Sequence, residues 1–162
     1  MPVFHTIRRA RPDEAERLTE IALASKSHWG YPEAWIEEWR EGLTFTEAYI
    51  TEHAVYVAVD EADAPVACYA LEGVGAEIQL EHVWVLPSSM GQGLGKALVT
   101  HAADTAQSLG ATALLIHSDP NAEPFYEKLG AVTIGTVRAD VCGERRELPR
   151  MRYELVSLVS VE

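Results

Sequence analysis

Three glycines at alternate positions stand out in the stretch Gly91-Gln92-Gly93-Leu94-Gly95-Lys96. Glycine removes side chains where main-chain N–H groups have to converge on an anion. An apolar stretch precedes this loop and a helical pattern follows it, so the unpaired N–H groups of a first helical turn would face the same anion. The loop therefore predicts a seat for a pyrophosphate.

Two other glycine loops that bind phosphates have a different spacing. A Walker A loop needs Gly at position 90 and Ser or Thr at 97, where this chain has Met90 and Ala97. A dinucleotide fingerprint needs Gly at 96 or 98, where the chain has Lys96 and Leu98. The spacing excludes both, and a plain flexible turn remains as the alternative.

Two segments together give a family resemblance. Residues 83–99, VWVLPSSMGQGLGKALV, resemble the acetyl-CoA loop of the GNAT N-acetyltransferase family, and residues 119–131, DPNAEPFYEKLGA, resemble the element that follows it in that family. Both occur in the family's order and separation, and the resemblance covers roughly residues 53–138. It implies an enzyme that transfers acetyl from acetyl-CoA to an amine.

The resemblance also implies which residues bind the donor. Met90 stands where the family usually has Gln or Arg, so we expect binding weaker by about 1 kcal/mol, a typical hydrogen-bond increment. The N–H of Val85 would stabilise the oxyanion. The expected acetyl-CoA-binding residues are Val83, Val85, Met90, Gly91, Gln92, Gly93, Leu94, Gly95, Lys96, Asn121 and Tyr126.

Two proton-transferring side chains are implied as well. An alkylammonium has a pKa near about 10.4, so at pH 7 the acceptor needs a base. Glu81 stands where the family places a base or a water-orienting group. Tyr126 stands where the family has a tyrosine beside the CoA sulfur, and a phenol with a pKa near about 10 can protonate the departing thiolate. We expect Glu81 to act through water as base and Tyr126 as acid.

Each assignment has a purely structural alternative. Glu81 could be a solvent-facing carboxylate, Tyr126 an aromatic packed between helix and sheet, and Asn121 a helix N-cap instead of a partner of the pantetheine arm. His82 has an intrinsic pKa better suited to a base. Strand alternation, however, puts His82 on the face opposite Glu81, so we expect a packed core histidine.

The acceptor pocket is predicted in the segment SKSHWGY, residues 25–31. Its rings and polar groups suit a small amine, although packing is an equal alternative. Trp35 and Trp39 lie one helical turn apart and are expected in the core. The predicted acceptor residues are Lys26, His28, Trp29 and Tyr31.

We expect a small-molecule primary amine as acceptor, because no long basic or acidic docking tract is evident. A protein N-terminus or lysine is the alternative within the enzyme class. A CoA-binding regulatory domain without turnover is the alternative outside it.

The elements that must position these residues alternate in type. We expect a mixed α/β fold with a mostly antiparallel sheet of six to seven strands and about four helices, in one domain over residues 1–162. The predicted strands cover residues 5–9, 54–59, 66–71, 77–85, 111–117, 131–138 and 151–159. The predicted helices begin at Pro12, after Pro32, near Leu94 and at Asn121, and a polar loop is predicted over residues 140–149.

Composition narrows the partners. The formal net charge of -12 argues against a nucleic-acid partner and fits a cationic or neutral acceptor. Cys68 and Cys142 have no metal-ligand spacing, so neither a metal site nor a disulfide framework is expected. No segment has the length and apolarity of a leader or a membrane span, which predicts a cytoplasmic protein without a membrane partner. The family resemblance makes a homodimer conceivable.

Overall fold

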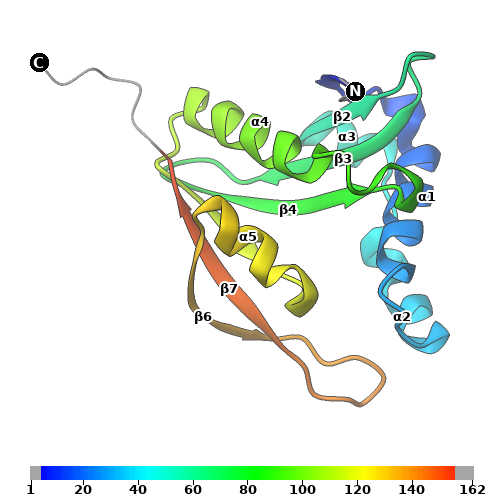
Figure 1. The fold of residues 1–162 in the computed structure, drawn as a ribbon, viewed down its shortest axis with the longest axis vertical. Helices are drawn as coiled ribbons and strands as arrows, with labels where there is room; N and C mark the ends of the chain where they lie inside the picture. The colour runs from blue at the N-terminus through cyan, green and yellow to red at the C-terminus, as the bar shows by residue number, and fades with distance from the viewer. Residues whose placement is uncertain (1–4, 156–162) are drawn as a thin grey trace, which may run out of the picture. The chain divides into compact units, whose positions relative to one another are not determined.

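The computed structural model of the chain describes residues 5–155. As predicted, its strands form one mixed, mostly antiparallel sheet, which has seven strands (Figure 1). The strand order is β1-β2-β3-β4-β5-β7-β6. The strands are β1 (Thr6–Arg9), β2 (Ala54–Val59), β3 (Pro65–Glu72), β4 (Glu77–Val85), β5 (Ala113–His117), β6 (Val132–Arg138) and β7 (Glu147–Glu154). The α-helices are α1 (Ala15–Ser27), α2 (Glu33–Leu43), α3 (Glu47–Glu52), α4 (Leu94–Ser108) and α5 (Glu123–Leu129).

The chain divides into two compact units. Within the described residues, unit 1 comprises residues 5–70 and 82–99, and unit 2 comprises residues 71–81 and 100–155. Strand β4 and helix α4 each contribute residues to both units. A single domain over residues 1–162 stays a prediction.

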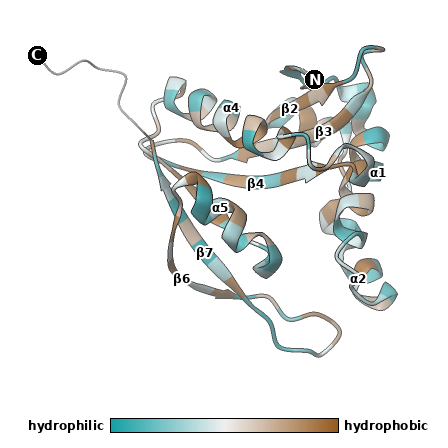
Figure 2. Cartoon of the chain, in the orientation of Figure 1, coloured by the Kyte–Doolittle hydropathy of each residue, from teal (hydrophilic) through white to brown (hydrophobic). Residues whose placement is uncertain are grey.

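The core of unit 1 forms where α1 and α3 cover β2 and β3. Pro12 and two carboxylates open a short 3-10 helix, Pro12–Glu14, which leads into α1. The sequence spacing predicts a buried stripe of α1 at Ala15, Leu18, Ile21, Ala22 and Ser25, and all of these except the half-buried Ala15 are buried. The stripe packs against alternate residues of β2, which pairs with β1 in antiparallel register. Apolar residues accordingly gather along β2 and β3 (Figure 2).

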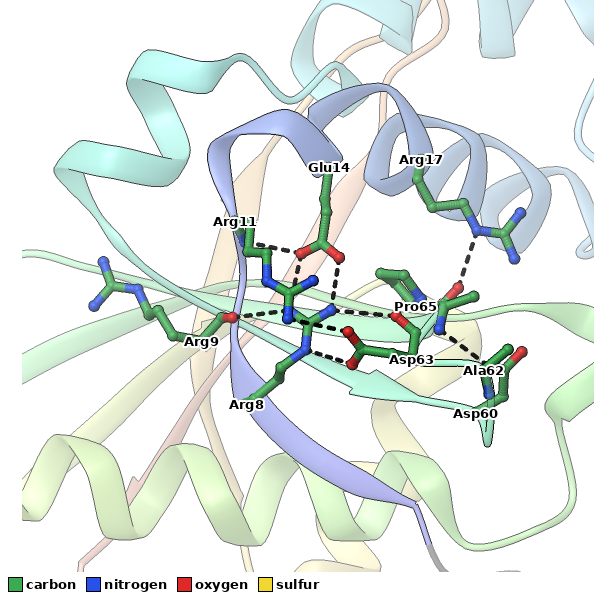
Figure 3. Close-up of polar contacts among 10 residues, drawn as sticks. Arg8, Arg9, Arg11, Glu14, Arg17, Asp60, Ala62, Asp63 and Pro65 are labelled. Carbon is green, nitrogen blue, oxygen red and sulfur yellow. Dashed lines mark hydrogen bonds and ion pairs between the residues drawn. The ribbon is translucent and has the colours of Figure 1, made fainter.

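Polar contacts tie the start of unit 1 to the turn between β2 and β3. Arg8 donates to both oxygens of Glu14 at 2.7 and 3.0 Å and to Oδ1 of Asp63 at 2.9 Å (Figure 3). Arg11 forms a second ion pair with Asp63 at 3.0 Å. Asp63 has a φ of 65°, a left-handed turn conformation that Asp tolerates better than most residues. One charged cluster therefore joins two segments that are distant in sequence, residues 8–14 and the turn at Asp63.

Unit 2 is built around β5. It pairs with β7 in antiparallel register from Ala113↔Glu154 to His117↔Arg150, and β7 pairs in turn with β6. The ladder between β4 and β5 is parallel and has only three pairs, ending at Gln79↔Leu115, although β4 continues to Val85.

Three details of the prediction are wrong. Helix α3 was not expected, because six residues are too short to show a helical period; Thr46 caps it by accepting from Tyr49 N at 3.0 Å. Strand β7 begins at Glu147, inside the predicted polar loop, because the edge strand β6 pairs with it as far as Arg138↔Glu147. Residues 156–159 of the predicted strand lie outside the described residues.

The third detail concerns α4. The sequence spacing predicts one buried helical face made of Leu94, Leu98, Ala102, Ala106 and Leu109. The first four residues are buried, but Leu109 is 59% exposed. The helix ends at Ser108, and Gly110 takes a φ of 96°, so Leu109 no longer follows the helical face.

Candidate functional site

Strand β4 carries both candidate bases, and its alternation separates them as predicted. His82 and Trp84 lie on one face, where the indole Nε1–H of Trp84 donates to His82 Nδ1 at 2.8 Å. The His82 ring lies 4.7 Å from that of Phe45, a buried core residue of unit 1. His82 is thus half-buried among aromatic rings, which agrees with the prediction of a packed histidine.

The Trp84 hydrogen bond also indicates which nitrogen of His82 acts as an acceptor. An indole is a donor only, so the Nδ1 that accepts from it carries no proton and the proton of the neutral ring sits on Nε2. Neither nitrogen can then take up a proton unless the contact with Trp84 breaks first. This geometry argues against His82 as the general base.

Glu81 has the properties that a base near neutral pH needs. Its side chain reaches solvent, yet the surrounding protein removes enough water for desolvation to raise its pKa above the ordinary value. The nearby carboxylate of Glu72 raises that pKa further. Glu72 belongs to β3, and nothing in the linear sequence marked it as a partner of Glu81.

The glycine loop in unit 1 has the conformation of an anion seat. Gly91 and Gly93 both have a φ of 81°, in the left-handed region that favours glycine, and a Cβ at either position would meet open space. Helix α4 begins at Leu94, and its first main-chain bond runs from Ala97 N to Gly93 O at 3.1 Å.

Main-chain donors of that loop are available. Within residues 5–155, the N–H groups of Gly93, Leu94 and Gly95 donate to no protein acceptor. Unpaired N–H groups at the start of a 15-residue helix suit the diphosphate of CoA. The half-buried Met90 precedes them and leaves these donors unaffected.

The free edge of β4 offers a second set of main-chain groups. Because the ladder with β5 stops at Gln79, the residues of β4 beyond it lack that partner strand. Val83 and Val85 are half-buried there. An extended amide-bearing arm such as pantetheine can pair with such an edge as another strand would.

Tyr126 lies in unit 2 and is buried on α5. Burial raises the pKa of its phenol, and the negative charge of Asp119 raises it further, so the side chain keeps its proton at neutral pH. Its ring contacts Phe125 edge to face at 5.0 Å. Helix α5 ends at Gly130, which has a φ of 111° as a left-handed C-cap.

Asn121 is not the helix N-cap that one interpretation expected. The cap of this segment is Asp119, whose Oδ1 accepts from Asn121 N at 2.8 Å. Pro120 opens a short 3-10 turn directly after that cap, which moves the start of α5 to Glu123. Asn121 is exposed on this turn.

The predicted acceptor segment divides into two parts. Lys26 and Tyr31 belong to a half-buried cluster with Trp35 and Trp39 of α2. His28 and Trp29 are exposed and contact each other at 6.0 Å between ring centroids.

The two tryptophans of α2 only partly fit the core prediction. Trp39 packs against the core of unit 1, as expected. Trp35 is half-buried and contacts the rings of Tyr31 and Trp39. The i, i+4 spacing predicts that the two tryptophans contact each other, but no signal in the sequence placed them beside Tyr31.

Two further searches cover the described residues only. Residues 5–155 contain no group of three or more His, Cys, Asp or Glu side chains arranged to hold a metal ion. No helix in that range is both long enough and apolar enough to cross a membrane.

Comparison with known proteins gives consistent matches. The model of the acetyltransferase (GNAT) family matches residues 15–131. The chain is 30% identical over 149 residues to the peptidyl-lysine N-acetyltransferase YjaB of Salmonella typhimurium, covering 91% of this chain and 97% of that protein.

Two solved structures share the fold. A GCN5-related N-acetyltransferase from Rhodopseudomonas palustris has a TM-score of 0.80 at 23% identity, with 96% of this chain and 98% of that chain covered. The PaiA N-acetyltransferase of Thermoplasma acidophilum, solved in complex with coenzyme A, has a TM-score of 0.72 at 19% identity, with 94% and 99% covered.

Proposed function

The chain belongs to the acetyltransferase (GNAT) family and takes acetyl from acetyl-CoA, and from this premise we propose that its acceptor is a primary amine, in the first place a protein lysine side chain. The observation that carries the proposal is the 30% identity to a peptidyl-lysine N-acetyltransferase across 91% of the chain. The sequence by itself favoured a small-molecule amine. The half-buried rings of Tyr31, Trp35 and Trp39 support either acceptor, because aromatic faces attract an alkylammonium whatever carries it.

Main-chain groups would hold the donor. Acetyl-CoA supplies an acetyl group activated as a thioester. The N–H groups of residues 91–96 would bind its diphosphate, with Gln92 and Lys96 as side-chain partners in place of the missing one at Met90. Val83, Val85 and Asn121 would bind the pantetheine arm.

Glu81 would remove the proton that keeps the acceptor unreactive. The lone pair of an amine is blocked while the nitrogen is protonated, and a carboxylate with a raised pKa is a stronger base than an ordinary one. The hydrogen bond that engages His82 Nδ1 favours Glu81 over its neighbour on the strand. A water between Glu81 and the amine fits its exposed side chain.

Tyr126 would return a proton to the departing sulfur. A phenol with a raised pKa is a weak acid toward an ordinary thiolate, whose pKa is about 8.5. Removal of water raises the proton affinity of a thiolate too, so the transfer becomes feasible where both groups are desolvated. The N–H of Val85 would stabilise negative charge on the carbonyl oxygen.

The acceptor class can be tested with matched substrates. We would measure thiol release from acetyl-CoA with a lysine peptide whose N-terminus is blocked, the same peptide with a free N-terminus and norleucine in place of lysine, and a panel of free amino acids and polyamines. Preference for the blocked lysine peptide supports the proposal. Preference for a free amine of the panel would favour the small-molecule acceptor, and preference for the norleucine peptide would favour a protein N-terminus.

A further inference from the structure

The cluster of α1 and α2 already contains an alkylammonium, that of the chain itself. Lys26 Nζ lies 4.4 Å from the ring centroid of Trp39 and 5.2 Å from that of Tyr31. At such distances an ammonium over an aromatic face is attracted by the electron-rich face of the ring. The two rings therefore form a site for an alkylammonium, and the structure shows how one is seated.

The rings are held in place before any ligand arrives. Tyr31 stacks on Trp35 with 5.7 Å between ring centroids and meets Trp39 edge to face at 5.1 Å. Trp35 and Trp39 contact each other at 5.7 Å, and Trp39 packs on the core of unit 1. A rigid ring pair loses little conformational entropy when a ligand binds, which increases the affinity for that ligand.

The charge around the cluster attracts a further cation. Helix α2 carries Glu33, Glu37, Glu38 and Glu41 against the single cation Arg40, so its four carboxylates and one guanidinium give a net charge of -3. Arg40 pairs with Glu37 at 2.9 Å. All four carboxylates lie on exposed residues. The single positive charge of Lys26 does not neutralise the net charge of helix α2, so this region remains negative.

We propose that Tyr31 and Trp39 form the binding site for the alkylammonium of the acceptor, and that Lys26 is an internal competitor that occupies this site when no acceptor is bound. The inference rests on the proposed function and extends it, because it makes the protonated acceptor the species that binds. The bound acceptor must then lose one proton before its nitrogen can attack the thioester. When an acceptor binds, its ammonium replaces that of Lys26 over the two rings.

Removal of the competitor tests the exchange directly. Lys26→Met keeps the unbranched chain and removes the charge. We expect it to tighten the binding of n-butylammonium, measured by tryptophan fluorescence without acetyl-CoA, by about 3- to 10-fold, the range of a partly desolvated cation–π contact. The KM of the lysine peptide should fall by a similar factor. Neutral n-butanol should bind neither protein.

Two controls separate the ring site from general electrostatics and from misfolding. Arg40→Met removes one positive charge from the same surface without touching the rings, and should change the affinity for n-butylammonium by less than about twofold because exposed charges are screened. Adding Tyr31→Leu to Lys26→Met should abolish the gain. Tyr31 lies outside the buried core, so this variant is expected to fold, which unchanged circular dichroism would verify.

The inference is overturned if Lys26→Met leaves the affinity for n-butylammonium unchanged or weakens it, or if Arg40→Met tightens it equally. It is also overturned if the lysine peptide is acetylated while its KM does not fall in Lys26→Met. The proposed function fails separately, if wild type and Lys26→Met acetylate no amine although Lys26→Met binds n-butylammonium more tightly.

Discussion

At the scale of single residues, protonation states decide the roles. His82 Nδ1 accepts a hydrogen bond from the indole of Trp84, whereas Glu81 is partly desolvated by the surrounding protein and lies near a second carboxylate. Tyr126 is buried and protonated. These three environments differ in ways that intrinsic pKa values alone would not reveal, since by intrinsic pKa histidine is the better base.

Glu72→Gln tests the base through its pH dependence. Glu81 is active when deprotonated, so kcat/KM should rise as the pH passes upward through its raised pKa. Removal of the Glu72 charge lowers that pKa and should move the acidic limb of the profile to lower pH. Comparing the variant and wild type with the same acceptor cancels the acceptor's own titration. If the acidic limb of the profile does not move, the group that titrates in it is not Glu81.

Tyr126→Phe tests the acid. The variant keeps the ring and its packing but loses the hydroxyl, so we expect kcat to fall by about 100-fold or more, as for loss of a general acid. The melting temperature should change little, and the Kd for CoA measured by calorimetry serves as control. Full turnover in this variant across the pH range would remove Tyr126 from the chemistry.

At the scale of elements, two turns position charged groups by unusual backbone angles. The glycine loop uses a φ of 81° at Gly91 and Gly93 to direct N–H groups away from the protein. The turn between β2 and β3 uses a φ of 65° at Asp63 to bring a carboxylate to Arg8. Both conformations are local, and the turn at Asp63 acts on a residue distant in sequence.

Gly93→Ala should weaken CoA binding more than it destabilises the fold. The added Cβ has room, yet a left-handed φ costs an L-residue about 1–2 kcal/mol, so the loop is expected to relax and turn its N–H groups. Gly75→Ala is the matched control, because Gly75 has a φ of 104° and open space in another loop. Titration calorimetry with CoA should show loss for Gly93→Ala only; equal affinities would disprove the seat.

Glu14→Gln should destabilise unit 1 in a pH-dependent way. Burial by itself would raise the pKa of Glu14, but hydrogen bonds from Arg8 and from Arg11 N outweigh it and hold the pKa below the ordinary value. This stabilisation is present above the unfolded-state pKa and is lost as pH falls through the folded-state pKa. We expect a loss of about 1.5–3 kcal/mol at pH 7, typical of hydrogen bonds to charged groups.

Denaturant unfolding of Glu14→Gln and wild type at pH 7 and at successively lower pH measures this loss. The difference in unfolding free energy should shrink with acid. Glu20→Gln, which breaks only an exposed pair with Arg17 at 3.4 Å, should change little. A constant difference at all pH values would contradict the ionic origin of the effect.

At the scale of the whole molecule, charge is the property that every acceptor meets first. The net charge of -12 attracts cations over distances beyond contact and is screened by salt. Such a field favours cationic acceptors and does not by itself choose among them. Short-range contacts in the proposed acceptor site must therefore distinguish one cationic acceptor from another.

The KM of a lysine peptide flanked by Arg should therefore rise several-fold as NaCl increases from about 20 to about 200 mM, because the Debye length shortens to below about 10 Å. The same peptide flanked by Glu is the control and should show the opposite trend. Steady-state kinetics at constant saturating acetyl-CoA measures both. Parallel behaviour of the two peptides would exclude electrostatic attraction by the chain.

The sequence by itself determined the family, the donor and most elements, because these depend on local patterns. The glycine spacing of residues 91–96 and the string at residues 125–130 are read without tertiary context. Apolar alternation predicted that His82 and Glu81 lie on opposite faces of β4, which the Trp84 contact and the solvent-facing carboxylate confirm.

Only the tertiary structure decided which distant residues act on one another. Glu72 raises the pKa of Glu81 from a neighbouring strand, Asp119 takes the capping role expected of Asn121, and the ammonium of Lys26 lies over the ring of Trp39. Electrostatic and ring contacts depend on the distance between the groups in space. That distance is determined by the tertiary packing and cannot be derived from the spacing of the residues in the sequence.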